Sequence, residues 1–184
     1  NINKSKKEIN SVNDLKDDLE ELGLIIPKDC YFYTAGMAVR DYIKNKLSRF
    51  PNNNFIVGVI GEMGLYQTLN SLSRHDNFFL QDELDTTRNN KDTKLYIIIG
   101  SVNRIKIKHL DKILNWIKAG AKVITTCNDT SDPSSKGDFN LGMPSHMLHM
   151  VGYNIKTKSY SIGKPHPIHK IKIMEKLKIN KPEE

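Results

Sequence analysis

Three short apolar runs, each bounded by turn-forming residues, constrain the fold of this chain most strongly. They are FIVGVIG at 55–61, LYIIIGS at 95–101 and AKVITT at 121–126. Near-continuous apolar runs of this length are typical of strands that are buried on both faces. Because helical patterns alternate with these strands, the chain is expected to form a largely parallel α/β sheet.

The helical patterns are read from spacing and from end signals. A capping box of Ser5 and Glu8 opens an amphipathic pattern over 5–22, and Gly23 ends it. A β-rich run stands at 30–34 and a short strand is expected at 159–163. Polar stretches at 74–93 and 127–142 are predicted to be loops or a small flap. Further helices are predicted over 35–47, just after residue 61, and over 109–120, 144–153 and 166–177.

Charge and cysteine content narrow the class of protein. The net charge is +7, but the lysines are scattered among Asn, Ile and Asp instead of forming a stripe, which argues against a nucleic-acid surface. Cys30 and Cys127 stand far apart without a CxxC motif, as in a reduced cytoplasmic protein. No apolar run approaches the roughly 20 residues that span a bilayer, so no membrane association is expected.

Two motifs are chemically ambiguous. VIGEMG at 59–64 follows a strand, but it lacks the Lys-Ser/Thr of a P-loop and matches only part of the dinucleotide fingerprint, so a plain turn from strand into helix is favoured. The pairs His146 with His149 and His166 with His169 have helical spacing. They have no further ligands at suitable spacing for zinc, which favours ordinary surface or core histidines.

Lys164 is more informative because it lies between Gly163 and Pro165 directly after a strand. That position is the carboxyl edge of an α/β sheet, where such folds bind their ligands. An ammonium there suits a phosphate or a carboxylate. A solvated lysine in a turn explains the same three residues, and the local sequence leaves both interpretations open.

The segments CYFYTAGMAVRDYI, VIGEMGL, LYIIIGS, AKVITTCND and YSIGKPHP occur in an order that resembles the haloacid dehalogenase superfamily of phosphatases. The resemblance covers residues 1 to about 175. It is strongest to the group of 4-nitrophenylphosphatases, phosphoglycolate phosphatases and pyridoxal phosphatases. It implies an α/β fold with a C2-type α/β cap domain and part of a Rossmann-like haloacid dehalogenase core.

The resemblance also implies a mechanism. In that family a core Asp attacks the phosphoryl group to form an aspartyl-phosphate, a second Asp acts as acid and base, and core carboxylates hold Mg²⁺. A Lys in a strand-GKP context pairs with the nucleophile and the phosphate. Lys164 matches that position, which makes it the implied catalytic residue.

The chain lacks the Asp-x-Asp-Gly nucleophile motif and the acidic Gly-Asp motif that follows the GKP helix in relatives. The expected organisation is therefore a fragment that is inactive alone, with Mg²⁺ bound by core residues outside it. Core pieces are assigned to 1–35 and 141–184, and the cap to 36–140. By resemblance, the partners are a small phosphorylated metabolite and a second copy bound through the cap.

The implied substrate contacts in the cap depart from the family pattern. Val102 stands where relatives often have Asp, and Pro144 interrupts the usual Gly-x-Gly hinge that begins at Gly142. These departures leave the substrate undetermined. The residues that match the substrate-binding positions are Asn103, Arg104, Thr126 and Asp129.

Two alternatives remain open at this point. One is a homologue without catalytic Asp motifs that serves as a binding or dimerisation module. The other is a basic RNA-binding α/β domain, whose affinity would fall steeply with salt.

Overall fold

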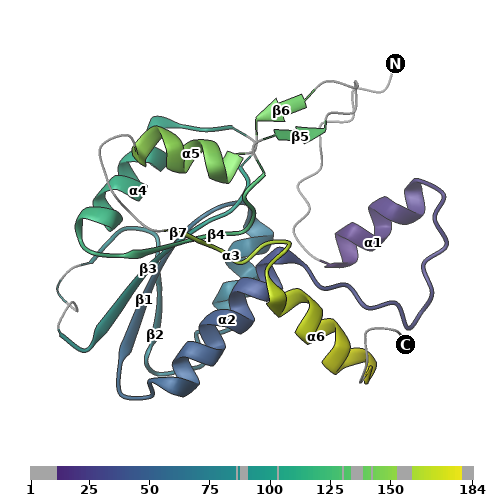
Figure 1. Ribbon diagram of the computed structural model, residues 1–184, viewed down its shortest axis with the longest axis horizontal. Coiled ribbons are helices and arrows are strands. Elements are labelled where there is room, and N and C mark those ends of the chain that lie inside the picture. The colour runs from purple at the N-terminus through teal and green to yellow at the C-terminus, as the bar shows by residue number, and fades with distance from the viewer. Residues whose placement is uncertain are drawn as a thin grey trace.

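The computed structural model describes residues 12–85, 87, 91–102, 104–129, 131–133, 139–141, 143–152 and 159–179. A five-stranded parallel sheet forms the centre, in the order β2-β1-β3-β4-β7 (Figure 1). A small antiparallel pair, β5 with β6, lies apart from it. The strands are β1 (Asn54–Ile60), β2 (Phe78–Gln81), β3 (Thr93–Ile99), β4 (Lys122–Thr125), β5 (Ser131–Pro133), β6 (Phe139–Leu141) and β7 (Ser159–Ser161).

Helices cover both faces of the central sheet (Figure 1). α2, α3 and α6 pack on one face, whereas α4 and α5 pack on the other. α1 lies to the side of these layers and buries no residue. The helices are α1 (Val12–Glu21), α2 (Ala35–Arg49), α3 (Met63–Asn70), α4 (Ile107–Lys118), α5 (Met143–Gly152) and α6 (Pro167–Leu177).

The alternation of side chains in β1 and β3 explains the two cores. Phe55 and Val57 face α2 and α3, whereas Ile56 and Ile60 face α4. All seven residues of β1 pair with those of β3, from Asn54 with Thr93 to Ile60 with Ile99. A strand that is apolar on both faces must be covered on both faces, so the predicted parallel α/β architecture is confirmed.

One local expectation was wrong. The predicted loop over 74–93 contains strand β2, because Phe78 to Gln81 pair in parallel with β1 over Phe55 to Gly58. Residues 30–34 form no strand, since no described strand lies beside them and a strand needs a hydrogen-bonded neighbour. Burial of Phe78 against the existing core outweighs the polar composition around it.

The position of β7 bears on the predicted domains. β7 belongs to the segment assigned to the core, yet it pairs with β4 of the segment assigned to the cap, through Val123 with Ser159. Both strands therefore belong to one sheet. The division at residues 35 and 140 stays a prediction.

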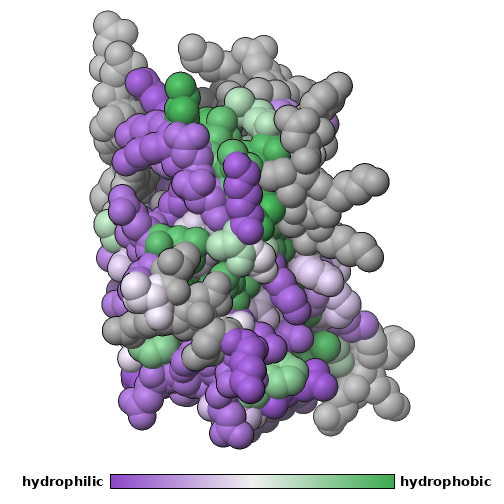
Figure 2. All heavy atoms as spheres, turned by 90° about the vertical axis from the view of Figure 1, so that its left-hand side faces the viewer, coloured by the Kyte–Doolittle hydropathy of each residue, from purple (hydrophilic) through white to green (hydrophobic). Residues whose placement is uncertain are grey.

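The exposed surface differs between the two sides of the molecule. On the face near β2 and α4, most of the described residues are hydrophilic, with smaller apolar areas between them (Figure 2). Several large exposed apolar side chains belong to α6 and to the segment after α1, on the other side in Figure 1, while Ile107 of α4 is also 77% exposed. Among the described residues, no helix combines the length and apolar character that crossing a bilayer requires.

Gly58 tests the packing of β1 against α4. A Cβ at this position would lie 2.6 Å from Cε2 of Trp116, a fully buried ring. Gly58→Ala is therefore expected to lower the free energy of unfolding by about 1–3 kcal/mol through overpacking. Urea denaturation of the variant measures this change.

Gly152→Ala at the end of α5 is the matched control. A Cβ there meets no atom within 4 Å, so its stability should stay equal to that of the wild type or rise slightly. Equal destabilisation by the two substitutions would contradict the packing described for β1.

Candidate functional site at the carboxyl edge of the sheet

The carboxyl ends of the five parallel strands lie at one edge of the sheet. β1 is followed by α3 and then by β2, its neighbour on one side. β3 is followed by α4 and then by β4, which lies on the other side. α3 and α4 lie on opposite faces. This reversal of strand order leaves a crevice outside the carboxyl ends, the place where open α/β sheets bind ligands.

Backbone hydrogen bonds continue beyond the strands and tie this edge together. The amide of Gly100 donates to the Ile60 carbonyl at 2.7 Å, and the amide of Thr126 donates to the Ile99 carbonyl at 3.0 Å. Leu65 of α3 lies against both glycines, since a Cβ on Gly61 or Gly100 would come within 2.8 or 2.6 Å of its Cδ2 atom. The VIGEMG segment thus connects β1 to α3, and its Gly61 leaves room for the Leu65 side chain.

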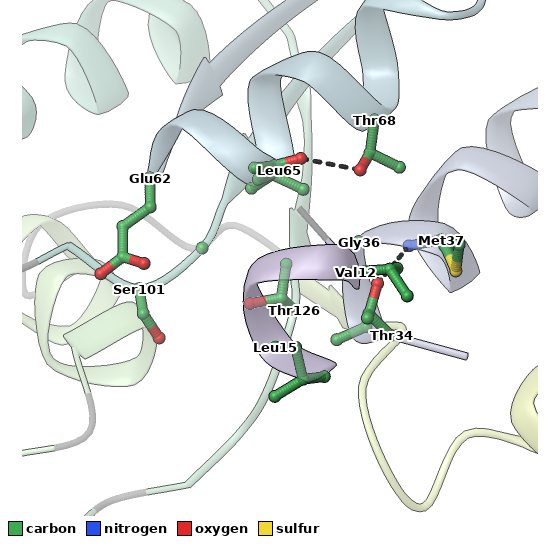
Figure 3. A pocket seen from close by; sticks show the side chains of 13 residues that line it. Val12, Leu15, Thr34, Gly36, Met37, Glu62, Leu65, Thr68, Ser101 and Thr126 are labelled. Atoms are coloured by element: carbon green, nitrogen blue, oxygen red, sulfur yellow. Dashed lines mark hydrogen bonds between the residues drawn. The ribbon is translucent and has the colours of Figure 1, made fainter. Parts of the chain in front are cut away.

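A pocket of about 280 Å³ opens at this edge (Figure 3). Its walls come from α1, the start of α2, the start of α3 and the loops that follow β3 and β4. Val12, Leu15 and Leu65 supply apolar surface, while Ser101 and Thr126 supply hydroxyl groups. The pocket therefore joins segments that are far apart in the chain.

The start of α2 gives the pocket a partial positive charge. Thr34 is the N-cap, and its side-chain oxygen accepts a hydrogen bond from the Met37 amide at 3.2 Å. On the α3 side, Thr68 donates to the Gly64 carbonyl at 2.7 Å. A helix N-terminus favours anions, whereas the Glu62 carboxylate in the opposite wall disfavours them. The pocket can hydrogen-bond a polar group, and its charge is mixed.

The predicted catalytic lysine lies beside this pocket, not in its wall. Lys164 is exposed and follows the buried residues Ile162 and Gly163 at the end of β7. Gly163 packs directly on the backbone of Thr126, because a Cβ there would lie 1.9 Å from the Thr126 carbonyl oxygen. Only glycine allows this approach, which brings the GKP turn next to a pocket residue.

The predicted substrate-binding residues are separated by the structure. Thr126 lines the pocket and is 9% exposed. Arg104 and Asp129 are exposed and do not line it. Asn103 lies outside the described residues. Of the three positions that the structure describes, Thr126 alone lines the pocket.

The histidines of the GKP segment have structural contacts that sequence reasoning missed. His166 is the N-cap of α6, and its Nδ1 accepts a hydrogen bond from the Ile168 amide at 3.2 Å. Nε2 of His169 lies 3.0 Å from the Ile162 carbonyl oxygen. Pro167 at the first position of α6 was the available signal, since proline favours that position and places His166 at the cap. In α5, His146 is half-buried and His149 is exposed.

A polar network supports this segment from α2. The Tyr33 hydroxyl donates to Asp41 at 3.0 Å, and the Arg40 guanidinium donates to the same carboxylate at 2.7 Å. Burial, followed by the charge of Asp41, raises the pKa of Tyr33 well above its usual range. The ring of Tyr33 also meets His169 edge-on, with ring centroids 5.5 Å apart.

A second cavity of about 720 Å³ lies between α4 and the ends of β1 and β2. Nζ of Lys112 donates to the Val59 carbonyl at 2.9 Å and to Asp82 at 2.7 Å. Strand β2 stops at Gln81, paired with Gly58, so the lysine caps a carbonyl that the short edge strand leaves unpaired. The hydrogen bond and charge of Lys112 lower the pKa of Asp82.

The described residues contain no cluster of metal-binding side chains. Across the residues that the structure describes, no three His, Cys, Asp or Glu side chains lie close enough to hold a metal ion. Neither Cys30 nor Cys127 forms a disulfide within the described residues.

Comparison with known proteins identifies structural relatives only. The chain matches no protein-family model and no curated protein sequence. Solved structures do match. A point mutant of the thermostable p-nitrophenylphosphatase of Bacillus stearothermophilus is 23% identical, with a TM-score of 0.69, over 95% of this chain and 60% of that protein. The chain therefore spans less than two thirds of that relative.

Two further solved structures match the fold of this chain. The p-nitrophenyl phosphatase of Archaeoglobus fulgidus is 20% identical, with a TM-score of 0.65, over 90% of this chain and 56% of that one. A glycerol phosphate phosphatase of Mycobacterium tuberculosis, solved in complex with magnesium, is 16% identical, with a TM-score of 0.72, over 91% and 46%. Over the matched length, the chain thus has the same α/β fold as these solved structures.

The histidine cap of α6 predicts a pH dependence. Burial, followed by the charge of His169, lowers the pKa of His166, so the folded state favours the neutral ring that accepts from Ile168. A depressed pKa means that this stability is present above the unfolded pKa of about 6.5 and is lost as the pH falls. Loss of the cap on protonation should weaken the fold by about 1 kcal/mol.

Thermal unfolding at pH 7.5 and 5.5 measures this effect. His166→Asn keeps a capping oxygen that does not titrate, so it should lose less stability than the wild type on acidification. An equal loss in both proteins would contradict the role of His166 as a neutral cap.

Proposed function

We propose that these 184 residues belong to a Mg²⁺-dependent phosphomonoester hydrolase, in which Lys164 binds the transferred phosphoryl group and the carboxylate that attacks it. The observation that carries this proposal is the location of the GKP turn. Gly163 packs on Thr126 at the carboxyl edge, beside the pocket at the strand-order reversal. The phosphatase fold of the structural relatives supports the same reading.

Lys164 suits this role chemically. Its ammonium is a compact charge with three donors, so it can bind a phosphate oxygen and a carboxylate at once. Charge that develops on the phosphoryl oxygens during transfer would be stabilised by this fixed cation. The buried backbone of Ile162 and Gly163 holds the start of the turn, while the lysine side chain stays exposed and able to reach a ligand.

We assign the remaining chemistry to residues beyond those described. Mg²⁺ would neutralise the phosphate, and the described residues offer no group of three ligands for it. A nucleophilic Asp and its acid-base partner would likewise come from outside this sequence. The 184-residue chain alone is accordingly expected to be inactive.

Exposed apolar side chains support the proposal that these residues contact another part of a catalytic core. Leu22 and Ile25, after α1, are 79% and 94% exposed, and Leu177 of α6 is 53% exposed. They lie on the same side of the molecule, with α1 and α6 (Figure 1). Apolar side chains in such number suit contact with another part of a catalytic core.

We propose a small phosphorylated metabolite as substrate, with Thr126 as the contact that the pocket geometry favours. Asn103, Arg104 and Asp129 remain predicted contacts of the loops after β3 and β4. Homodimerisation through the cap segment and a cytoplasmic location also remain predictions, based on resemblance and composition.

Substitution of Lys164 tests the proposal. In the full-length protein, Lys164→Ala should lower kcat/KM for 4-nitrophenyl phosphate by roughly 100-fold or more, because a fixed transition-state cation is removed. Lys164→Arg keeps the charge but not the geometry, so it should recover only part of the activity. Initial rates at saturating Mg²⁺ give both values.

Lys170→Ala is the matched control, since Lys170 is exposed and lies one turn into α6. It should leave kcat/KM unchanged. An unchanged rate for Lys164→Ala would contradict the assignment. Absence of turnover in the full-length protein, or turnover by the 184 residues alone, would favour a binding module or a different catalytic site.

A further inference from the structure

We infer that His169 is a positioning residue that holds the turn carrying Lys164 in place. The inference rests on the proposed role of Lys164. It assigns a function to a histidine whose spacing with His166 had suggested only a helical pair. A set of contacts joins α6, the end of β7 and the segment before α2.

The first contact is to the backbone just before the GKP turn. Nε2 of His169 lies 3.0 Å from the Ile162 carbonyl oxygen. Ile162 is 1% exposed, so without this histidine its carbonyl would lose a partner in a place that water reaches poorly. A carbonyl can only accept, so Nε2 must carry the hydrogen and donate it.

The next carbonyl is held from the same helix. The His166 amide donates to the Gly163 carbonyl at 2.8 Å. On the other side, the Ile162 amide donates to the Thr125 carbonyl at 2.9 Å. The residues before Lys164 are thus fixed by β4 and by the first turn of α6. Of these contacts, only that of His169 comes from a side chain and can be removed by substitution alone.

The orientation of the His169 ring is also fixed. Tyr33 meets the ring edge-on at an interplanar angle of 81°, and its hydroxyl is bound to Asp41. Asp41 is in turn paired with Arg40 at 2.7 Å. This arrangement couples the start of α2, whose residues line the pocket, to the turn that presents the lysine.

These contacts determine how accurately the Lys164 side chain is placed. A small displacement of a group that contacts a transferring phosphoryl lowers the rate without changing the chemistry available. If His169 acts through Lys164, its removal should matter only when the lysine is present. A residue that merely stabilises the fold would lower activity independently of Lys164.

The experiment is a double-mutant cycle in the full-length protein. His169→Leu should lower kcat/KM for 4-nitrophenyl phosphate by about 3- to 10-fold, the effect expected from one hydrogen bond. His169→Gln keeps a donor near the Nε2 position and should restore most of that loss. In a Lys164→Ala background, His169→Leu should have no further effect. His149→Leu, an exposed histidine of α5, is the matched control and should match the wild type.

Hydrogen exchange of the Gly163, Lys164 and His166 amides gives a second measurement that requires no activity. Exchange should become faster in His169→Leu and stay near wild type in His169→Gln. Unchanged exchange in His169→Leu, or additive losses in the cycle, would overturn the inference. If no full-length variant hydrolyses the ester, faster exchange still supports the positioning role, and the failure then lies with the proposed function.

Discussion

The in-register pairing of β1 with β3 is the constraint on which the rest of the structure depends. Both strands are apolar on both faces, so helices must cover the sheet from both sides. α3 and α4 then leave from opposite faces, and the strand order reverses between β1 and β3. This reversal creates the crevice at the carboxyl edge. The pocket and the GKP turn are therefore consequences of how two short apolar strands are buried.

Close backbone approach turns this edge into a candidate site. Gly163 lies against the Thr126 carbonyl, and Gly100 and Gly61 make room for Leu65. Side chains at these positions would push the loops apart. Segments from the two ends of the chain also meet near this edge, because Tyr33 of CYFYT contacts His169 of the GKPHPIHK segment. Segments that are far apart in the sequence therefore lie close together around the end of β7.

Sequence periodicity was sufficient for the buried strands, because β1, β3 and β4 are continuous apolar runs whose burial dominates their local preference. It failed for β2, a run of four residues that is stabilised by its pairing with β1 and by burial of Phe78. Lys164 could be chosen from sequence because it follows a predicted strand in a GKP context. Thr126 could be chosen because it matches a substrate-binding position of the family that the sequence resembles. The roles of Lys112 and His169 could not, since each caps a carbonyl that becomes unpaired only in the folded chain.

The central claim is that Lys164 faces a phosphoryl group at the carboxyl edge of the sheet. A crystal structure of the full-length protein with Mg²⁺ and orthovanadate tests it most directly. The account predicts Nζ of Lys164 within about 3 Å of a vanadate oxygen, with the anion beside the Thr126 loop. A vanadate bound at another place, with Lys164 in solvent, would contradict it.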